Sequence, residues 1–253
     1  MSVQDSIFGG KFHYFEKVDS TNRIAKELAD DGAKEGTVVI CETQSGGRGR
    51  LSRTWISPRG GLWFSFILRP QISPKRAPMV TLLTGVAVAK AIRGFGLDAK
   101  IKWPNDVLIN ERKVSGILTE MDTNSDVVNY IVVGVGINAN VDRTVFLEEL
   151  KDRATSLKEE LKTEISRIEL MQSFLQELEH YYTSFKNKNY ECVISEWKRL
   201  SGTLGGHVRI ETPAEEIEGE AIDINSDGAL ILEQSDGSKK TIFAGDCTHV
   251  YRN

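Results

Sequence analysis

The composition of this chain is that of a folded protein with a mild excess of acidic residues. Its 253 residues are 40% hydrophobic and 27% charged, and the formal net charge is −4. A chain of this length can bury a substantial core, arranged as one large domain with a smaller one beside it. The acidic balance argues against a protein whose main partner is the nucleic-acid backbone, because such proteins usually carry a basic excess.

The sequence contains no recognisable targeting segment or membrane span. Its first six residues lack both a basic and an apolar region, and no apolar run approaches the roughly 20 residues that cross a bilayer. We therefore expect a cytoplasmic protein without a membrane partner. The three cysteines, Cys41, Cys192 and Cys247, are far apart, which predicts reduced thiols and no cysteine zinc site. The four histidines are equally scattered, which gives little support to a histidine metal centre.

The first part of the chain alternates strand and helix patterns. Residues 12–18 alternate as a strand, and 19–22 supply helix-capping oxygens before a helix over 23–29. Capping is the simplest role for Ser20 or Thr21. Two apolar runs, 37–41 and 62–68, then predict buried strands on either side of a loop.

The middle of the chain predicts a long helix followed by further strands. The helix begins at Pro74 or Pro78 and ends at Arg93, where glycines follow. Strands are expected over 99–103, 107–109, 114–121 and 129–138. Gly134 and Gly136 in the last strand indicate either a close approach of another group to the backbone or a bulge.

The C-terminal part predicts two helices and a small β-barrel. An apolar stripe that includes Ile168 marks a core-facing helix over 164–185, and a second helix covers 190–200. Short alternating strands follow at 207–211, 217–224, 229–233 and 241–243. The polar connector 142–162 is expected to be the most mobile segment. Residues 223–228 begin like a calcium loop, but Gln234 stands where a glutamate belongs, so a hairpin turn is the better interpretation.

The loop between the two buried strands is the most informative stretch of the chain. Residues 44–55 read QSGGRGRLSRTW. Glycines let backbone N–H groups approach a ligand, and arginines add permanent charge with planar donor forks. A mobile, solvated turn is the alternative, but binding residues are concentrated on loops held between core strands. The pattern therefore predicts a site for a small anion.

This loop and four other segments, taken in order, resemble the biotin protein ligase family over essentially the whole chain. The other segments are DSTN at 19–22, KWPND at 102–106, KVSGIL at 113–118 and GVGIN at 134–138. The resemblance implies an α+β fold: a mixed β-sheet with packed helices, like class II aminoacyl-tRNA synthetases, followed by an SH3-like barrel. It places the catalytic biotin and ATP domain at 1–201 and the barrel at 202–253.

The resemblance also implies a two-step reaction and assigns residues to it. Biotin and ATP would give biotinyl-5′-AMP, with magnesium as a cofactor, and the acyl group would pass to a lysine of a biotin carboxyl carrier domain of a carboxylase or decarboxylase. The implied catalytic residues are Lys113, Arg48, Arg50 and Asp106. The implied biotin-binding residues are Ser20, Thr21, Asn22, Gln44, Gly47, Arg48, Lys113 and Gly116. The implied ATP and adenylate residues are Arg50, Arg53, Trp55, Lys102, Asn105 and Asn138.

Two of these assignments keep alternatives. Trp55 is expected to stack on adenine, although a lid residue packed against the core is its alternative. Asp106 would hold magnesium and position the incoming lysine, unless it only caps its Pro-Asn-Asp turn. The loop 46–53 is expected to close over the intermediate and exclude water.

Other functions remain open at this stage. A lipoate or octanoate transferase would share the architecture but lack the glycine-arginine loop followed by a tryptophan. A biotin or nucleotide sensor, or an arginine-loop nucleic-acid protein, would keep the pocket without turnover, and steep salt dependence of binding would mark the nucleic-acid protein. With about a dozen residues before the first strand, no DNA-binding repressor domain is expected, and no nucleic-acid partner. The sequence leaves open which acceptor is modified and whether the chain forms a homodimer.

Overall fold

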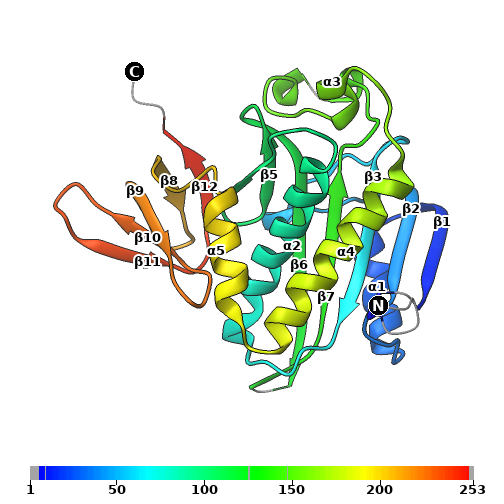
Figure 1. Ribbon diagram of the computed structural model, residues 1–253, viewed down its shortest axis with the longest axis horizontal. Coiled ribbons are helices and arrows are strands. Elements are labelled where there is room, and N and C mark those ends of the chain that lie inside the picture. The colour runs from blue at the N-terminus through cyan, green and yellow to red at the C-terminus, as the bar shows by residue number, and fades with distance from the viewer. Residues whose placement is uncertain (1–5, 9, 125, 147, 251–253) are drawn as a thin grey trace.

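The computed structural model describes residues 6–8, 10–124, 126–146 and 148–250. A seven-stranded mixed sheet forms the centre of the larger part of the molecule (Figure 1). Its strands are β1 (Phe12–Val18), β2 (Val38–Gln44), β3 (Leu62–Leu68), β4 (Lys100–Lys102), β5 (Asp106–Ile109), β6 (Arg112–Asn124) and β7 (Val127–Ile137). Their order across the sheet is β1-β2-β3-β7-β6-β5-β4.

The sheet is antiparallel except at one edge, where β1 pairs with β2 in parallel. That edge follows from connectivity, because α1 (Thr21–Asp30) carries the chain back between the two strands. The central strand β3 is buried along its whole length, as its unbroken apolar run predicts. The expected glycine strand is β7, and Gly134 and Gly136 pair with β3 and β6 in regular register, without a bulge at either position.

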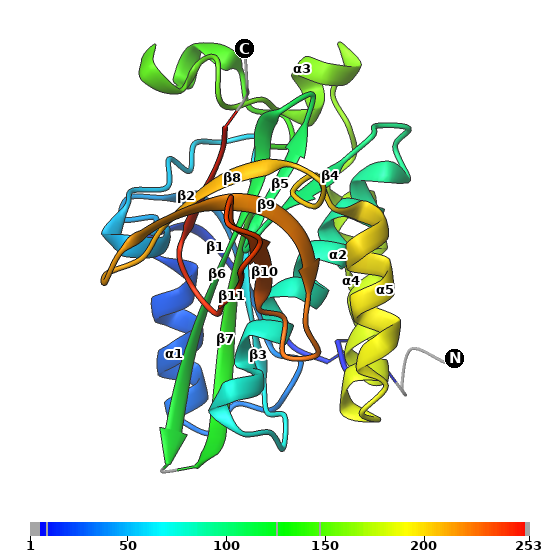
Figure 2. The ribbon, with the colours of Figure 1, turned by 90° about the vertical axis from the view of Figure 1, so that its left-hand side faces the viewer.

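Helices cover both faces of the sheet. The helices α2 (Ala77–Arg93), α4 (Arg167–Lys186) and α5 (Tyr190–Leu200) contribute to the main core on one face. Helix α1 packs on the other face, where Ala25 and Ala29 meet Val39 and Ile67. Figure 2 shows α1 separated from α2, α4 and α5 by the strands. Most of α2 is buried, which explains why its sequence is apolar on nearly every side.

The C-terminal part is a second, five-stranded antiparallel sheet, the small sheet domain that the sequence predicts. Its strands are β8 (His207–Glu211), β9 (Glu216–Ile224), β10 (Leu230–Glu233), β11 (Lys239–Ile242) and β12 (Asp246–His249). Buried hydrogen bonds join it to the larger part of the molecule. The backbone N–H of Trp103 donates to Thr203 Oγ1 at 2.9 Å, and Trp103 Nε1 donates to the carbonyl of Gly228 at 3.3 Å.

The structure corrects several local predictions. Ile168 is 73% exposed because it lies in the first turn of α4, on the side away from the core. Ser20 occupies the N-cap of α1, but its side chain makes no capping hydrogen bond. The polar connector 142–162 contains the short helix α3 (Leu157–Leu161), which Ser156 caps by accepting from the N–H of Glu159. Strand β12 was not predicted.

The hairpin turn expected at residues 223–228 is present. The calcium-like segment is a turn between β9 and β10 in which Asn225 Oδ1 accepts from the N–H groups of Asp227 and Ala229. All three cysteines are free thiols. Within the described part of the chain, no helix has the length and apolar character needed to cross a membrane.

Candidate active site

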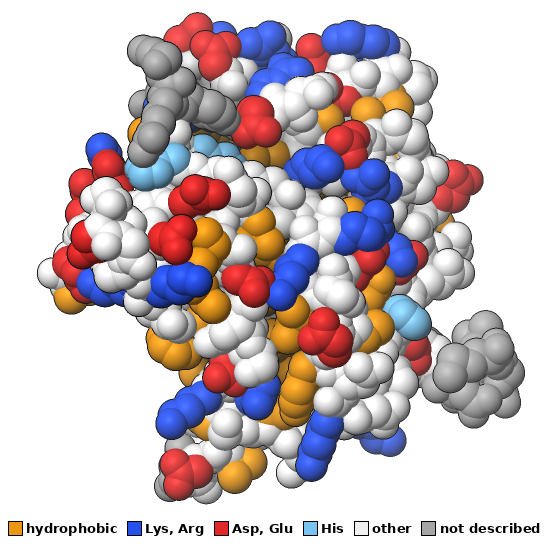
Figure 3. Space-filling model, turned by 60° about the vertical axis from the view of Figure 1, so that its left-hand side comes forward, with side chains coloured by type: hydrophobic (Ala, Val, Ile, Leu, Met, Phe, Trp, Pro, Cys, Tyr) orange, Lys and Arg blue, Asp and Glu red, His pale blue; other side chains and the backbone are white. Residues whose placement is uncertain are grey.

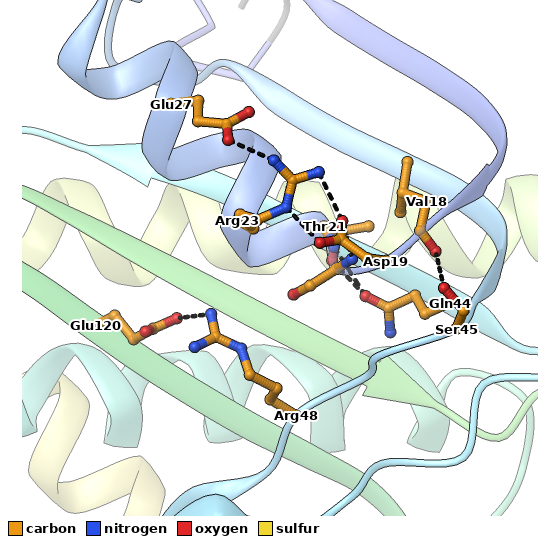
Figure 4. A network of polar contacts seen from close by, with 10 residues as sticks. Val18, Asp19, Thr21, Arg23, Glu27, Gln44, Ser45, Arg48 and Glu120 are labelled. Carbon is orange, nitrogen blue, oxygen red and sulfur yellow. Dashed lines mark hydrogen bonds and ion pairs between the residues drawn. The ribbon is translucent and has the colours of Figure 1, made fainter.

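The candidate site lies on the face of the sheet that carries α1. The loop between β2 and β3, residues 46–53, extends over this face, and Figure 4 shows Arg48 reaching from it toward Glu120 on β6. The N-terminus of α1 lies at the same place, because Thr21 contacts Gln44 at the end of β2. The site is therefore assembled from helix, loop and sheet residues that are distant in sequence.

A buried polar network connects the start of α1 to the sheet. Gln44 Oε1 accepts from the Thr21 N–H at 2.8 Å and from Thr21 Oγ1 at 3.2 Å, while Gln44 Nε2 donates to Ser57 Oγ at 2.8 Å. Ser65 Oγ, fully buried on β3, lies 2.8 Å from Thr21 Oγ1 and 2.6 Å from Asn22 Oδ1. These bonds fix the orientation of polar groups before any ligand is present, which lowers the cost of binding one.

Glycines form the floor of the site because side chains would collide there. A Cβ on Gly116 would lie 3.0 Å from the Trp55 ring, and one on Gly136 would lie 2.4 Å from Trp55 Nε1. A Cβ on Gly47 would lie 2.3 Å from the Trp55 carbonyl oxygen. The close approach expected at Gly134 is also present, because a Cβ there would lie 2.0 Å from Asn22 Oδ1. The Trp55 ring therefore packs against the sheet beside Gly116 and Gly136.

The three arginines of the loop are each held by an oxygen of the protein. Arg48 Nη2 donates to Glu120 Oε2 at 3.1 Å. Arg50 Nη1 donates to Asn105 Oδ1 and Arg50 Nη2 to the carbonyl of Gly245, both at 3.0 Å. Arg53 forms an ion pair with Asp246 at the start of β12. The loop is thus attached to the sheet at one end and to the C-terminal domain at the other.

The electrostatic environment of these arginines differs. Burial lowers the pKa of Arg50, and the negative charges of Asp246 and Asp106 oppose that shift. The hydrogen bond from Arg53 lowers the pKa of Asp246, and the same bond raises the pKa of Arg53. A guanidinium that is partly desolvated, as Arg50 is, interacts more strongly with an added anion than an exposed one does.

A lysine–aspartate pair lies beside the glycine floor. Lys113 Nζ is 2.6 Å from Asp106 Oδ1, and the same ammonium lies 5.3 Å from the centre of the Trp55 ring. Both side chains come from β5 and β6, which are neighbours in the sheet. This arrangement points a fixed positive charge at the space beside Gly116, whose added Cβ would lie 3.4 Å from Lys113 Nζ.

The remaining predicted residues surround this centre at different depths. Asn105 Nδ2 donates to the carbonyl of Ile117 at 2.9 Å, which fixes the turn that receives Arg50. Asn138 is buried, and its amide donates to the carbonyl of Thr155 at 2.9 Å. Lys102 is half-buried on β4, next to Asp106 in the ladder.

Sequence reasoning missed several residues that organise the site: Ser57, Ser65, Glu120, Gly245 and Asp246. Serines and acids of ordinary strands and turns carry no local signal. Only the alternation along β6 could have indicated that Glu120 shares a face with Gly116, four positions before it.

The described residues do not form a magnesium site made of protein ligands alone. Asp106 presents a single carboxylate whose Oδ1 is already paired with Lys113. Among the described residues, no three histidine, cysteine or acidic side chains gather closely enough to hold a metal ion. The carboxylate of Asp106 therefore suits its lysine partner better than a metal ion.

Comparison with known proteins finds relatives over nearly the whole chain. Residues 14–138 match the model of the biotin/lipoate A/B protein ligase family, and residues 203–250 match the biotin protein ligase C-terminal domain. The bifunctional ligase/repressor BirA of Bacillus subtilis is 38% identical over 246 residues, which are 96% of this chain and 75% of that protein. The biotin–acetyl-CoA-carboxylase ligase of Mycobacterium tuberculosis is 30% identical, over 98% of this chain and 94% of that protein.

Solved structures extend the agreement to three dimensions. The biotin protein ligase of Aquifex aeolicus in complex with biotin and ATP superposes with a TM-score of 0.82 at 30% identity. That match covers 96% of this chain and 99% of the other. Both sheets are included in a match of this extent. On its sequence and its fold, the chain belongs to the biotin protein ligase family.

Proposed function

We propose that this chain activates biotin with ATP as biotinyl-5′-AMP and then transfers the biotinyl group to a lysine of a biotin carboxyl carrier domain of an acetyl-CoA carboxylase. The observation that carries this proposal is the convergence of the arginine loop, Lys113 and the polar start of α1 on one glycine-floored face. Support comes from the Aquifex relative, whose structure contains biotin and ATP, and from the Mycobacterium relative, named for its carboxylase substrate.

The proposed biotin pocket lies between the start of α1 and the glycine floor. Thr21, Gln44 and the backbone near Gly47 supply polar groups for the ureido ring, and Gly116 leaves space for the bicycle. Loss of one buried hydrogen bond in such a pocket costs about 1 to 3 kcal/mol. Ser20 and Asn22 would shape the wall of the pocket. The amide of Asn22 already donates to the Leu118 carbonyl and to Glu120.

In the proposed first step, a carboxylate oxygen of biotin attacks the α-phosphorus of ATP, and the bond to pyrophosphate breaks. The two reactants repel each other because both are anionic, so fixed cations must lie where they meet. Lys113 and Arg48 would face the carboxylate, and Arg50 the phosphate. Arg53, Trp55, Lys102, Asn105 and Asn138 would line the nucleotide side.

In the proposed second step, the acceptor amine attacks the carbonyl carbon of the adenylate, and AMP leaves. Asp106 orients Lys113 through their ion pair and would position the incoming amine beside it. Loop 46–53 would cover the mixed anhydride and keep water from hydrolysing it. Magnesium is expected to accompany ATP, since Mg²⁺ in nucleotide sites is held largely by phosphates and water.

Pyrophosphate exchange tests the proposed first step directly. Labelled pyrophosphate should enter ATP when biotin is present and no acceptor is added, with lipoate and octanoate as parallel acids. Exchange with biotin alone is the expected result. Exchange with lipoate or octanoate in place of biotin would indicate a relative of the lipoate or octanoate transferases. Biotin binding without any exchange would indicate a sensor.

A lysine substitution tests the proposed roles. Lys113→Ala should retain the fold and lower the exchange rate by at least 100-fold, as loss of a fixed charge at the reacting centre does. Lys240→Ala is the matched control, because Lys240 Nζ lies 2.6 Å from Glu215 in the C-terminal domain. An unchanged exchange rate in folded Lys113→Ala would refute the assignment.

A further inference from the structure

Glu120 is an acidic residue placed inside a site that must bind anions. It lies on β6, on the face that carries α1, and its side chain is 32% exposed. Its Oε2 atom accepts two hydrogen bonds, from Asn22 Nδ2 at 2.8 Å and from Arg48 Nη2 at 3.1 Å. A carboxylate beside a substrate carboxylate is unfavourable unless it performs some other function.

The contact with Asn22 fixes the position of this carboxylate. Asn22 is buried, its Nδ2 also donates to the Leu118 carbonyl at 3.3 Å, and its Oδ1 accepts from Ser65. With both ends of the amide engaged, Asn22 cannot turn its donors toward another group. Glu120 is therefore held in one place by a residue of the biotin pocket.

The contact with Arg48 uses only part of the guanidinium. Of the five N–H donors that an arginine carries, the bond to Glu120 uses one on Nη2. Among the described residues, no side chain takes a second hydrogen bond from Arg48. In Figure 4 the Arg48 side chain crosses from the loop to Glu120. The remaining donors stay available for a ligand while the side chain is held.

We infer that Glu120 is a positioning residue, which anchors Arg48 and the start of loop 46–53 against the biotin pocket before substrate arrives. This inference rests on the proposed function, in which Arg48 meets the biotin carboxylate. The anchor reduces the conformational freedom that loop and side chain lose on binding. Glu120 therefore favours biotin binding even though its own charge repels the substrate.

Limited proteolysis of the protein without ligand tests the anchor. Trypsin can cut the loop after Arg50 and Arg53, and cutting requires the loop to open. Glu120→Gln keeps the shape of the side chain and an acceptor for Asn22, but removes the charge. We expect loop cleavage to become about two- to fivefold faster, the range for a partly exposed ion pair. The KM for biotin in pyrophosphate exchange should rise by a similar factor, with kcat nearly unchanged.

Two further variants separate this role from a general loss of structure. Glu218→Gln is the matched control, because Glu218 pairs with Arg209 on strands of the C-terminal domain at a similar exposure. It should change neither loop cleavage nor the KM for biotin. In an Arg48→Gln background, Glu120→Gln should have no further effect on cleavage after Arg50 and Arg53, because the anchored partner is already gone.

Three results would overturn the inference: unchanged loop cleavage in Glu120→Gln, a lower KM for biotin in that variant, or an undiminished effect in the Arg48→Gln background. The last result would mean that Glu120 acts through its contact with Asn22 and not through the loop. Failure of the proposed function is distinguishable, because the wild-type protein would then show no biotin-dependent exchange while the cleavage measurements still report on the anchor.

Discussion

The hydroxyl of Ser65 offers the most direct test of the buried network beneath the site. Ser65 lies on β3 with no exposed surface, and its Oγ is 2.6 Å from Asn22 Oδ1 and 2.8 Å from Thr21 Oγ1. Ser65→Ala removes one oxygen and leaves the Asn22 acceptor without this donor. A buried polar group that loses its partner costs about 1 to 3 kcal/mol.

Urea unfolding followed by tryptophan fluorescence measures this cost. Trp63 is buried two residues before Ser65 and reports on the same strand. With a denaturant dependence of about 2.5 kcal/mol per molar urea, the expected loss moves the midpoint down by about 0.4 to 1.2 M. The KM for biotin should also rise, because Thr21 and Asn22 lose the group that orients them.

An exposed serine supplies the control for this experiment. Ser195 on α5 is exposed, and its Oγ donates to the carbonyl of Glu191 at 2.7 Å. Ser195→Ala should leave the midpoint unchanged or raise it slightly, since alanine favours helix and water replaces the lost bond. A Ser65→Ala midpoint within about 0.2 M of the wild type, or a loss equal to that of Ser195→Ala, would contradict the assigned network.

Three other perturbations follow from the same geometry. Gly47→Ala should lower kcat/KM in pyrophosphate exchange by at least 10-fold, because the new Cβ would lie 2.3 Å from the Trp55 carbonyl oxygen. Gly10→Ala is the control and should have no effect, because a Cβ there would meet no heavy atom within 4 Å. Asp246→Asn should raise the KM for ATP more than that for biotin, since it frees the nucleotide end of the loop; the opposite ranking would count against this assignment. Burial lowers the pKa of His249, so the unfolded state binds a proton at higher pH than the folded state does, and the stability of the fold decreases as the pH drops below about 6.5. In thermal melts, His249→Gln should lose part of this pH dependence. A pH profile identical to that of the wild type would exclude His249 as its source.

The local elements were predictable because the physical signal of each is contained in its own residues. The strand at 62–68 matches β3 at both ends, and its seven residues are all buried. Strand β12 escaped prediction because Asp246–His249 has little strand character of its own and forms by pairing with β8. Ile168 was placed in the core because the helical stripe continues past the point where the core ends.

The charged residues of the candidate site could be predicted from the sequence, whereas the residues that hold them in place could not. The glycines and arginines of loop 46–53 have few structural uses, so the sequence alone marks this loop as a candidate binding site. Their partners are ordinary residues far along the chain: Glu120 is 72 positions from Arg48, and Asp246 is 193 from Arg53. Nothing local distinguishes such an acid from any other acid, because its function arises only when the sheet and the C-terminal domain are in place.

The distribution of charge around the loop explains how it can be ordered without a ligand. On the face drawn in Figure 3, acidic and basic side chains are interspersed. The loop follows the same principle at close range, because each arginine is held by an oxygen of the protein and no two share one. Arg48 is held by the sheet, and Arg50 and Arg53 reach the C-terminal domain. The two attachments use different acids, Glu120 on the sheet and Asp246 on the C-terminal domain. A substitution of Glu120 should therefore change mainly the KM for biotin, and a substitution of Asp246 mainly the KM for ATP.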